Sequence, residues 1–234
     1  MTEERTEKEV ERERIAEEEQ TEQLLRTEEY GVWSGFGHVL KAIVRPLFKL
    51  LFPFRVKGLE NLPEDDRPLV VCCNHISMID PVFLLLAQKK ADVYFMGKAE
   101  LFGNGFSAWL LGKNFGSFPV ARGKGDTGAL DRAEQLIAER KWMGIFPEGT
   151  RSKTGELGRF KSGASLIAAK TQAYVLPVAV TTKDQKVKLF RRVTVSFGEV
   201  LSPSALELDG EKPNLRGATR TMMAAVTSLM EDAR

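Results

Sequence analysis

Residues 69–86 read LVVCCNHISMIDPVFLLL, an apolar run, a polar stretch of seven residues and a second apolar run in succession. The short first run, Leu69 to Cys73, predicts a buried strand. Pro81 suits the first position of a helix, and Val82 to Lys89 is predicted to be helical. In sheets built from such units, ligands lie beyond the carboxyl ends of the strands. The sequence therefore places Asn74 to Asp80 beyond the carboxyl end of a strand, where ligands bind in such sheets.

Two side chains of this stretch, His75 and Asp80, are candidates for a catalytic pair. On a continuous helix, five residues turn about 140° past a full turn, so the two side chains meet only if the residues between them form a turn. In that geometry the carboxylate accepts the Nδ1 proton, fixes the imidazole tautomer and leaves Nε2 to take a proton from a hydroxyl. Alternatively, Asp80 caps the following helix and His75 is a loop histidine. The stretch alone leaves both interpretations open.

The charge of the chain is unevenly distributed. Its 234 residues suffice for one domain with an extension, and a hydrophobic content of 43% can supply a sizeable core. Residues 1–30 contain twelve Glu and five Lys or Arg, so their net charge is −7 and the remainder carries +9. A basic body suits an anionic membrane surface, phosphate groups or an acidic carrier. We expect no nucleic-acid partner, because no motif of interleaved aromatic and basic residues is found.

The Glu-rich residues 1–30 are predicted to be a solvated helix or a disordered tail, since their apolar residues are too few for a heptad seam. This acidic start lacks an apolar core, so we expect no signal peptide and a cytosolic location. The two cysteines, Cys72 and Cys73, lie inside the apolar run. We expect them to be small buried core residues, with neither a disulfide nor a metal site.

Residues 31–54 are predicted to be an amphipathic helical segment. One helical face is cationic and holds His38, Lys41, Arg45 and Lys49. The longest charge-free run is about ten residues, against roughly twenty needed to span a bilayer, and Pro46 is expected to kink or break the helix. Either the segment covers the core of the domain, or its apolar face lies at the lipid headgroup boundary. Trp33 and four Phe favour the membrane interface.

Predicted strands and helices alternate from residue 55 onward. The predicted strands are Leu69–Cys73, Asp92–Met96, Trp142–Phe146, Tyr174–Val180 and Val193–Phe197. The predicted helices are Val82–Lys89, Phe106–Leu111, Thr127–Arg140, Ser162–Thr171 and Asn214–Asp232. This order predicts that residues 55–234 form an α/β domain with a mainly parallel sheet flanked by helices.

A second motif, FPEGTR at residues 146–151, follows one of these predicted strands. Pro147 and Gly149 suit a tight turn, Glu148 offers a carboxylate, and Arg151 offers a planar fork that matches a phosphate. Taken alone, the stretch favours a plain surface turn with an ion pair.

Together the two motifs resemble the glycerolipid acyltransferase family, in particular its bacterial 1-acyl-sn-glycerol-3-phosphate acyltransferases. In that family His-x4-Asp precedes Phe-Pro-Glu-Gly-Thr-Arg by some seventy residues, and here His75 and Glu148 are 73 positions apart. Further blocks that resemble the family are GKAELF at 97–102, FPVAR at 118–122, FKSGA at 160–164 and VLPVAV at 175–180. The resemblance covers residues 55–203. Ala121 departs from it, because many members carry an acidic residue there.

The resemblance implies transfer of a fatty acyl group from acyl-CoA or an acyl carrier protein to the free hydroxyl of 1-acyl-sn-glycerol 3-phosphate, which gives phosphatidic acid. The sequence contains no visible cluster of metal ligands, so we expect the chemistry to need no metal and no cofactor. His75 is then the general base and Asp80 its orienting partner, and no serine nucleophile is needed, so Ser77 is expected to be a turn residue. The residues expected to bind substrate are Glu148, Gly149, Thr150, Arg151, Arg122 and Lys98.

Several roles within this site stay open. Glu148 is expected either to hold the glycerol hydroxyl or to fix Arg151. Backbone N–H groups near His75 and Gly149 are expected to bind the thioester oxyanion, with Lys98 as a weaker candidate. The expected location is the cytoplasmic face of the membrane, as a peripheral or monotopic protein. Two alternatives are an acyltransferase for another lysolipid or aminolipid, and a peripheral lipid-binding protein without turnover.

Overall fold

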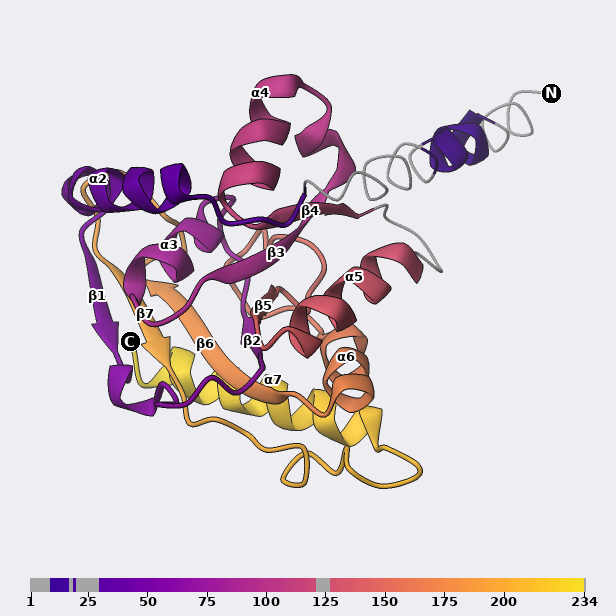
Figure 1. The fold of residues 1–234 in the computed structure, drawn as a ribbon. Coiled ribbons are helices and arrows are strands. Elements are labelled where there is room, and N and C mark those ends of the chain that lie inside the picture. Colours follow the sequence, from indigo (N-terminus) through magenta and orange to yellow (C-terminus); the bar gives the residue numbers. More distant parts are fainter. Residues whose placement is uncertain (1–8, 17–18, 20–29, 121–126, 234) are drawn as a thin grey trace. The chain divides into compact units, whose positions relative to one another are not determined.

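The computed structural model describes residues 9–16, 19, 30–120 and 127–233 (Figure 1). Most of the predicted acidic tail lies outside the described residues, and residues 9–16 within it are helical. The chain divides into two compact units. The smaller combines Met1–Val39 with Tyr94–Ala133, and the larger combines Leu40–Val93 with Glu134–Arg234.

Five strands of the larger unit lie side by side in the order β1-β7-β6-β2-β5. Their bounds are β1 Phe54–Lys57, β2 Leu69–Cys73, β5 Trp142–Ile145, β6 Tyr174–Thr182 and β7 Val193–Phe197. The central strand β2 pairs in parallel with β5 and β6, while β7 is antiparallel to β6 and parallel to β1. In this register Cys72 lies between Ile145 and Pro177, so the carboxyl ends of β2 and β5 coincide. The predicted α/β class with a mainly parallel sheet is confirmed.

Three helices of the larger unit cover this sheet. They are α3 Asp80–Ala87, α6 Gly163–Thr171 and α7 Leu215–Glu231. α7 packs against β6, β2 and α6, and α3 packs beside β7. In Figure 1, α3 lies above the strands and α6 and α7 lie below them. A short 3₁₀ turn, η1 Leu59–Asn61, follows β1.

The core of the larger unit is built on β2, whose residues are all buried. Cys72 and Cys73 are fully buried free thiols, which confirms their prediction as core residues. Burial raises the pKa of the Cys72 thiol to about 12. Phe83 of α3 packs edge-on against the rings of Phe48 and Phe54. The strand that leads into His75 is thus buried along its whole length.

The smaller unit contains a parallel pair of strands, β3 Val93–Lys98 and β4 Ser117–Val120, and the helical turns between them. Those turns are η2 Ala99–Phe102, α4 Gly105–Ser107 and the π-helical η3 Ala108–Gly112. Trp33 forms an isolated antiparallel bridge with Phe115 and packs edge-on against its ring. Helix α5, Thr127–Ala138, runs from this unit into the larger one.

Helix α2, Gly35–Leu51, also crosses from one unit to the other. It continues through Pro46, so the predicted break at that residue is wrong. Proline removes the hydrogen bond to the carbonyl four residues earlier, here that of Ala42. Both residues are exposed, so water can hydrate the freed carbonyl and the helix does not end.

Candidate active site

His75 and Asp80 meet across the turn that joins β2 to α3. The Nδ1 atom of His75 lies 2.8 Å from Oδ2 of Asp80. The same Oδ2 accepts hydrogen bonds from the backbone N–H groups of Ile76 and Ser77, each at 2.7 Å. Asp80 is buried and is the first residue of α3. The turn predicted from the spacing is present, and the hydrogen bonds of Asp80 run back to the turn and the imidazole.

The contact with Asp80 determines what the other ring nitrogen of His75 can do. A carboxylate oxygen that takes two backbone N–H groups is an acceptor, so Nδ1 donates to it and Nε2 keeps its lone pair. The imidazole stacks on Phe146, with ring centroids 4.2 Å apart and an angle of 24° between the planes. The His75 side chain is 18% exposed. The ring is therefore held in one orientation and still open to a ligand, as a general base requires.

A second carboxylate, that of Glu148, holds the backbone of His75. Its Oε1 accepts the N–H of His75 at 2.7 Å, and its Oε2 accepts the N–H of Gly158 at 2.8 Å. The carbonyl of His75 accepts the N–H of Ser152 at 2.8 Å. Glu148 is 7% exposed. Both of its oxygens are thus bound to backbone groups, so the contacts of Glu148 are those of a residue that positions His75.

Asn74 fixes the end of β2 from the other side and was not predicted from the sequence. Its amide nitrogen donates to the carbonyl of Val180 at 2.9 Å, and its side-chain oxygen accepts the N–H of Val180 at 2.8 Å. The side chain is fully buried. A buried amide that makes both of these bonds continues the pairing of β2 with β6 by one residue. The sequence feature that marks it is a polar residue directly after an apolar strand.

The FPEG turn brings a cation to the site that the sequence did not assign. The N–H of Gly149 donates to the carbonyl of Phe146 at 3.0 Å, and Gly149 has a φ of 72°, which favours glycine. A Cβ at Gly149 would lie 2.9 Å from Nζ of Lys161. The N–H of Lys161 donates to the carbonyl of Pro147 at 2.8 Å. The ammonium of Lys161 therefore lies beside the turn that carries Glu148.

Four backbone N–H groups in the region predicted to bind the oxyanion, near His75 and Gly149, are already used within the protein. The N–H of His75 is bound to Glu148, those of Ile76 and Ser77 to Asp80, and that of Gly149 to Phe146. Each of these four groups stabilises the turn that contains it, and the binding of an oxyanion by backbone N–H groups stays a prediction. The ammonium of Lys161 is a further donor beside the FPEG turn.

Arg151 and Thr150 are exposed and follow the turn directly. Ser152, the next residue, is bonded through its N–H to the carbonyl of His75. This bond brings the backbone of the Arg151 segment beside His75, at the carboxyl end of β2. The exposed Arg151 is thus the neighbour in sequence of a residue bonded to His75.

The other two predicted cations are not part of this cluster of described contacts. Lys98 ends β3 in the smaller unit and forms an ion pair with Glu100. Arg122 lies outside the described residues. Within the parts of the chain that the structure covers, no group of three or more His, Cys, Asp or Glu side chains is arranged to hold a metal ion.

Comparison with known proteins places these residues in one family. Residues 53–181 match the family model described as Acyltransferase, and this range contains His75, Asp80 and the FPEGTR stretch. The chain is 36% identical over 135 residues to the chloroplastic 1-acyl-sn-glycerol-3-phosphate acyltransferase LPAT1 of Arabidopsis thaliana, a match that covers 56% of this chain but only 37% of that protein. It is 29% identical over 177 residues to the 1-acyl-sn-glycerol-3-phosphate acyltransferase of Bacillus subtilis (strain 168), which covers 75% of this chain and 87% of that protein.

A solved structure has the same fold. The crystal structure of the 1-acyl-sn-glycerophosphate (LPA) acyltransferase PlsC from Thermotoga maritima superposes with a TM-score of 0.65 at 24% sequence identity, over 85% of this chain and 82% of that one. The family model covers more than half of the chain and includes both motifs. The protein belongs to the Acyltransferase family.

Proposed function

We propose that this protein transfers a fatty acyl group from an acyl thioester to the free hydroxyl of 1-acyl-sn-glycerol 3-phosphate and so forms phosphatidic acid. The observation that carries the proposal is the His75–Asp80 pair, in which Nδ1 is bound to a buried carboxylate and the ring stays partly exposed. The acceptor comes from the names of the relatives in Arabidopsis thaliana and Bacillus subtilis, both 1-acyl-sn-glycerol-3-phosphate acyltransferases.

In this mechanism Nε2 of His75 takes the proton of the acceptor hydroxyl while that oxygen attacks the thioester carbonyl carbon. The tetrahedral intermediate then collapses, the C–S bond breaks, and the imidazolium returns the proton to the departing sulfur. Asp80 stabilises the imidazolium between these two steps. Positioned proton transfer of this kind contributes about 10²–10⁴-fold to the rate.

Two cationic side chains are proposed to bind the negative charges of the reaction, which are the oxyanion and the acceptor phosphate. Lys161, whose ammonium lies beside Gly149, stabilises the oxyanion, since the backbone N–H groups of His75 and Gly149 are already bound within the protein. Arg151 binds the phosphate of the acceptor, because a planar guanidinium donates two parallel hydrogen bonds to a phosphate. The thioester donor is acyl-CoA or an acyl carrier protein, and both are anionic partners for the basic body of the chain.

Helix α2 supports a location at a membrane surface. Its exposed apolar side chains recur at steps of three and four and so form one stripe, which consists of Phe36, Val39, Ile43, Leu47 and Leu50. Each of these side chains is more than half exposed. An exposed apolar stripe next to a cationic face is suited to the headgroup boundary of an anionic leaflet. No helix in the described part of the chain has the length and apolar character needed to cross a bilayer.

The proposal therefore places the protein on the cytoplasmic face of the membrane, where its thioester donors occur and where lysolipid and product remain in the leaflet. This arrangement removes the need to carry either lipid through water.

Replacement of His75 tests the proposed chemistry. We expect His75→Ala to lower thiol release from acyl-CoA, measured with lysophosphatidic acid in vesicles, by about 10²–10⁴-fold, because the general base is lost. The matched control is Ser77→Ala in the same turn. It should keep a rate within a few-fold of the unmodified protein, since its backbone N–H and not its hydroxyl binds Asp80. Near-normal turnover by His75→Ala, with circular dichroism unchanged, would refute the mechanism.

A further inference from the structure

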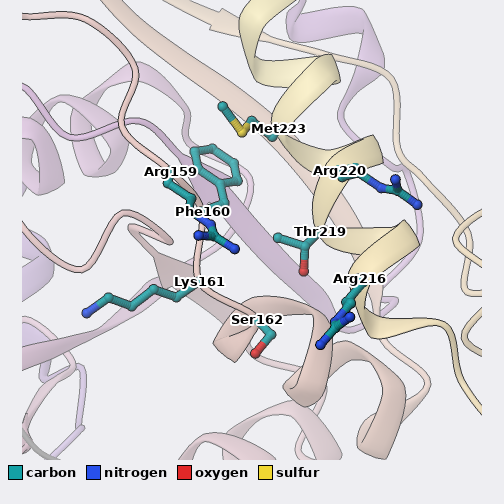
Figure 2. Close-up of a pocket in the computed structure, with 8 residues that line it drawn as sticks. All are labelled: Arg159, Phe160, Lys161, Ser162, Arg216, Thr219, Arg220 and Met223. Carbon is teal, nitrogen blue, oxygen red and sulfur yellow. The ribbon is translucent and has the colours of Figure 1, made fainter.

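The larger unit contains a pocket that the proposed chemistry does not use. It lies between the segment 159–162 and the first half of α7, and its volume is about 1130 Å³ (Figure 2). Four of the residues that line it are cationic, namely Arg159, Lys161, Arg216 and Arg220. None of its lining residues is acidic. Ligand sites are typically concave spaces of about 300–1,000 Å³, so the pocket has room for a ligand much larger than a single phosphate.

The four cations have no counterion among the residues that the structure describes. No ion pair between described residues involves any of them, and all four side chains are exposed. Arg220 also borders a second, smaller pocket that contains Glu207, but the carboxylate of Glu207 is bound by the side-chain amide of Asn214. A cluster of like charges without a carboxylate is suited to an anionic ligand.

Two of these cations lie near the start of a helix. Arg216 is the second residue of α7, in the first turn, where the helix dipole disfavours positive charge, and Arg220 is the sixth residue. They are also four residues apart, so they repel each other along one helical face. An anion bound between them offsets both effects.

The floor of the pocket is apolar. Phe160 is 5% exposed, and Met223 lines the pocket beside it (Figure 2). The hydroxyl of Thr219 donates its hydrogen bond to the carbonyl of Leu215 at 2.7 Å and so has no proton left for a ligand. The pocket therefore suits a ligand that carries several negative charges on a body with an apolar face, as a phosphorylated nucleoside does.

The pocket adjoins the candidate active site through the segment that forms one of its walls. At one end of this segment, the N–H of Gly158 is bound to Glu148, and at the other end the N–H of Lys161 is bound to Pro147. The side chain of Lys161 reaches Gly149, and Figure 2 shows it extended away from Arg216 and Arg220. A ligand anchored by the arginines of α7 thus lies one segment of backbone away from the FPEG turn.

We propose that this cationic pocket, which Arg159, Arg216 and Arg220 define, binds the phosphorylated adenosine end of a CoA thioester. The acyl-bearing arm then runs past the segment 158–161 towards His75. This inference rests on the proposed function, because it assigns the donor of that reaction. A concave pocket of this volume with an apolar floor favours a nucleotide over the broad acidic surface of a carrier protein.

Direct binding of CoA to the full chain tests the proposal without any turnover. We expect Arg216→Ala/Arg220→Ala to weaken CoA binding at least tenfold by titration calorimetry. The matched control, Lys186→Ala/Lys212→Ala, removes the same charge from exposed lysines outside the pocket and should bind CoA unchanged. Arg216→Gln/Arg220→Gln provides a second variant if the alanine protein does not fold. Equal CoA affinity in the folded pocket variant and the control would overturn the proposal.

Kinetic measurements then separate the donor from the acceptor. For the same variant, the KM for acyl-CoA should rise at least tenfold, while the KM for an S-acyl pantetheine, which lacks the nucleotide phosphates, and that for lysophosphatidic acid should not change. A raised KM for lysophosphatidic acid alone would assign the pocket to the acceptor and overturn the proposal. A selective loss of turnover with an acyl carrier protein would assign the pocket to that donor and would also overturn the proposal. If the unmodified protein transfers no acyl group, the proposed function fails, and CoA binding still decides the role of the pocket.

Discussion

At Asp80 the two carboxylate oxygens lie in unlike surroundings. Oδ2 accepts from His75, Ile76 and Ser77, whereas Oδ1 is buried and has no hydrogen-bond partner among the described residues. In Asp80→Asn the backbone N–H groups would keep the amide oxygen at the Oδ2 position and place the NH₂ group where no acceptor lies. The variant therefore keeps the imidazole tautomer but loses the negative charge that stabilises the imidazolium.

We expect Asp80→Asn to lower turnover about 10²-fold or more and to lower the free energy of unfolding by about 1–3 kcal/mol, the cost of one unsatisfied buried donor. Thiol-release kinetics and urea denaturation measure the two effects. A rate near that of the unmodified protein would show that the charge of Asp80 has no part in the reaction.

The proposed role of Arg151 is to bind the phosphate of the acceptor, so its replacement tests which acceptor the site takes. A charged hydrogen bond contributes about 1.5–3 kcal/mol, so Arg151→Ala should raise the KM for lysophosphatidic acid roughly ten- to hundredfold. Lys153→Ala removes a charge from an exposed residue two positions away and serves as the control. An unchanged KM in Arg151→Ala would contradict a phosphomonoester acceptor and favour another lysolipid or an aminolipid.

The sequence predicts the contacts of the site between residues that are close along the chain, but not those between distant residues. The contact between His75 and Asp80 is local and follows from their spacing and from the turn between them. The contact between Glu148 and the backbone of His75 is not predictable in this way, because it depends on the parallel register of β2 and β5. For the same reason the sequence suggested free N–H groups near His75, whereas Glu148 and Asp80 had already taken them.

The strands show the same difference between local patterns, which the sequence reports, and long-range pairing, which it does not. β2 and β7 have the predicted limits because their apolar and β-branched runs are buried. β1 and β4 were missed, since each has only four residues and they contain Arg55, Lys57 and Pro119, which do not resemble a strand pattern. Pairing with β7 and with β3 makes them strands, and no local pattern reports such pairing.

Helix α2 leads to a prediction about membrane binding. Leu47 is 58% exposed within the apolar stripe, and burying a leucine side chain yields about 1.5–3 kcal/mol. We therefore expect Leu47→Asp to weaken co-sedimentation with anionic vesicles at least about tenfold. Leu59→Asp, at a leucine of η1 that is 47% exposed, is the matched control and should bind vesicles as before. Equal losses in both variants would exclude α2 as the specific membrane contact.

For the whole molecule, the buried cysteines link stability to pH. Burial raises the pKa of Cys72 to about 12, and burial together with the charge of Asp80 raises that of Cys73 well above its usual range. In the unfolded chain both thiols ionise near pH 8.5. Above that pH the unfolded state releases protons that the folded state retains, so the free energy of unfolding falls as the pH rises towards 12, by about 1.4 kcal/mol per pH unit for each thiol.

Lysine and tyrosine side chains titrate in the same range, so the effect of the thiols must be isolated by comparison with Cys72→Ala/Cys73→Ala. We expect the unmodified protein to lose stability more steeply than this variant between about pH 9 and pH 10.5, by roughly 2–3 kcal/mol per pH unit. Urea denaturation at a series of pH values measures both slopes. Parallel slopes would mean that water reaches these thiols in the native state. β2, which leads directly into His75, would then open without global unfolding.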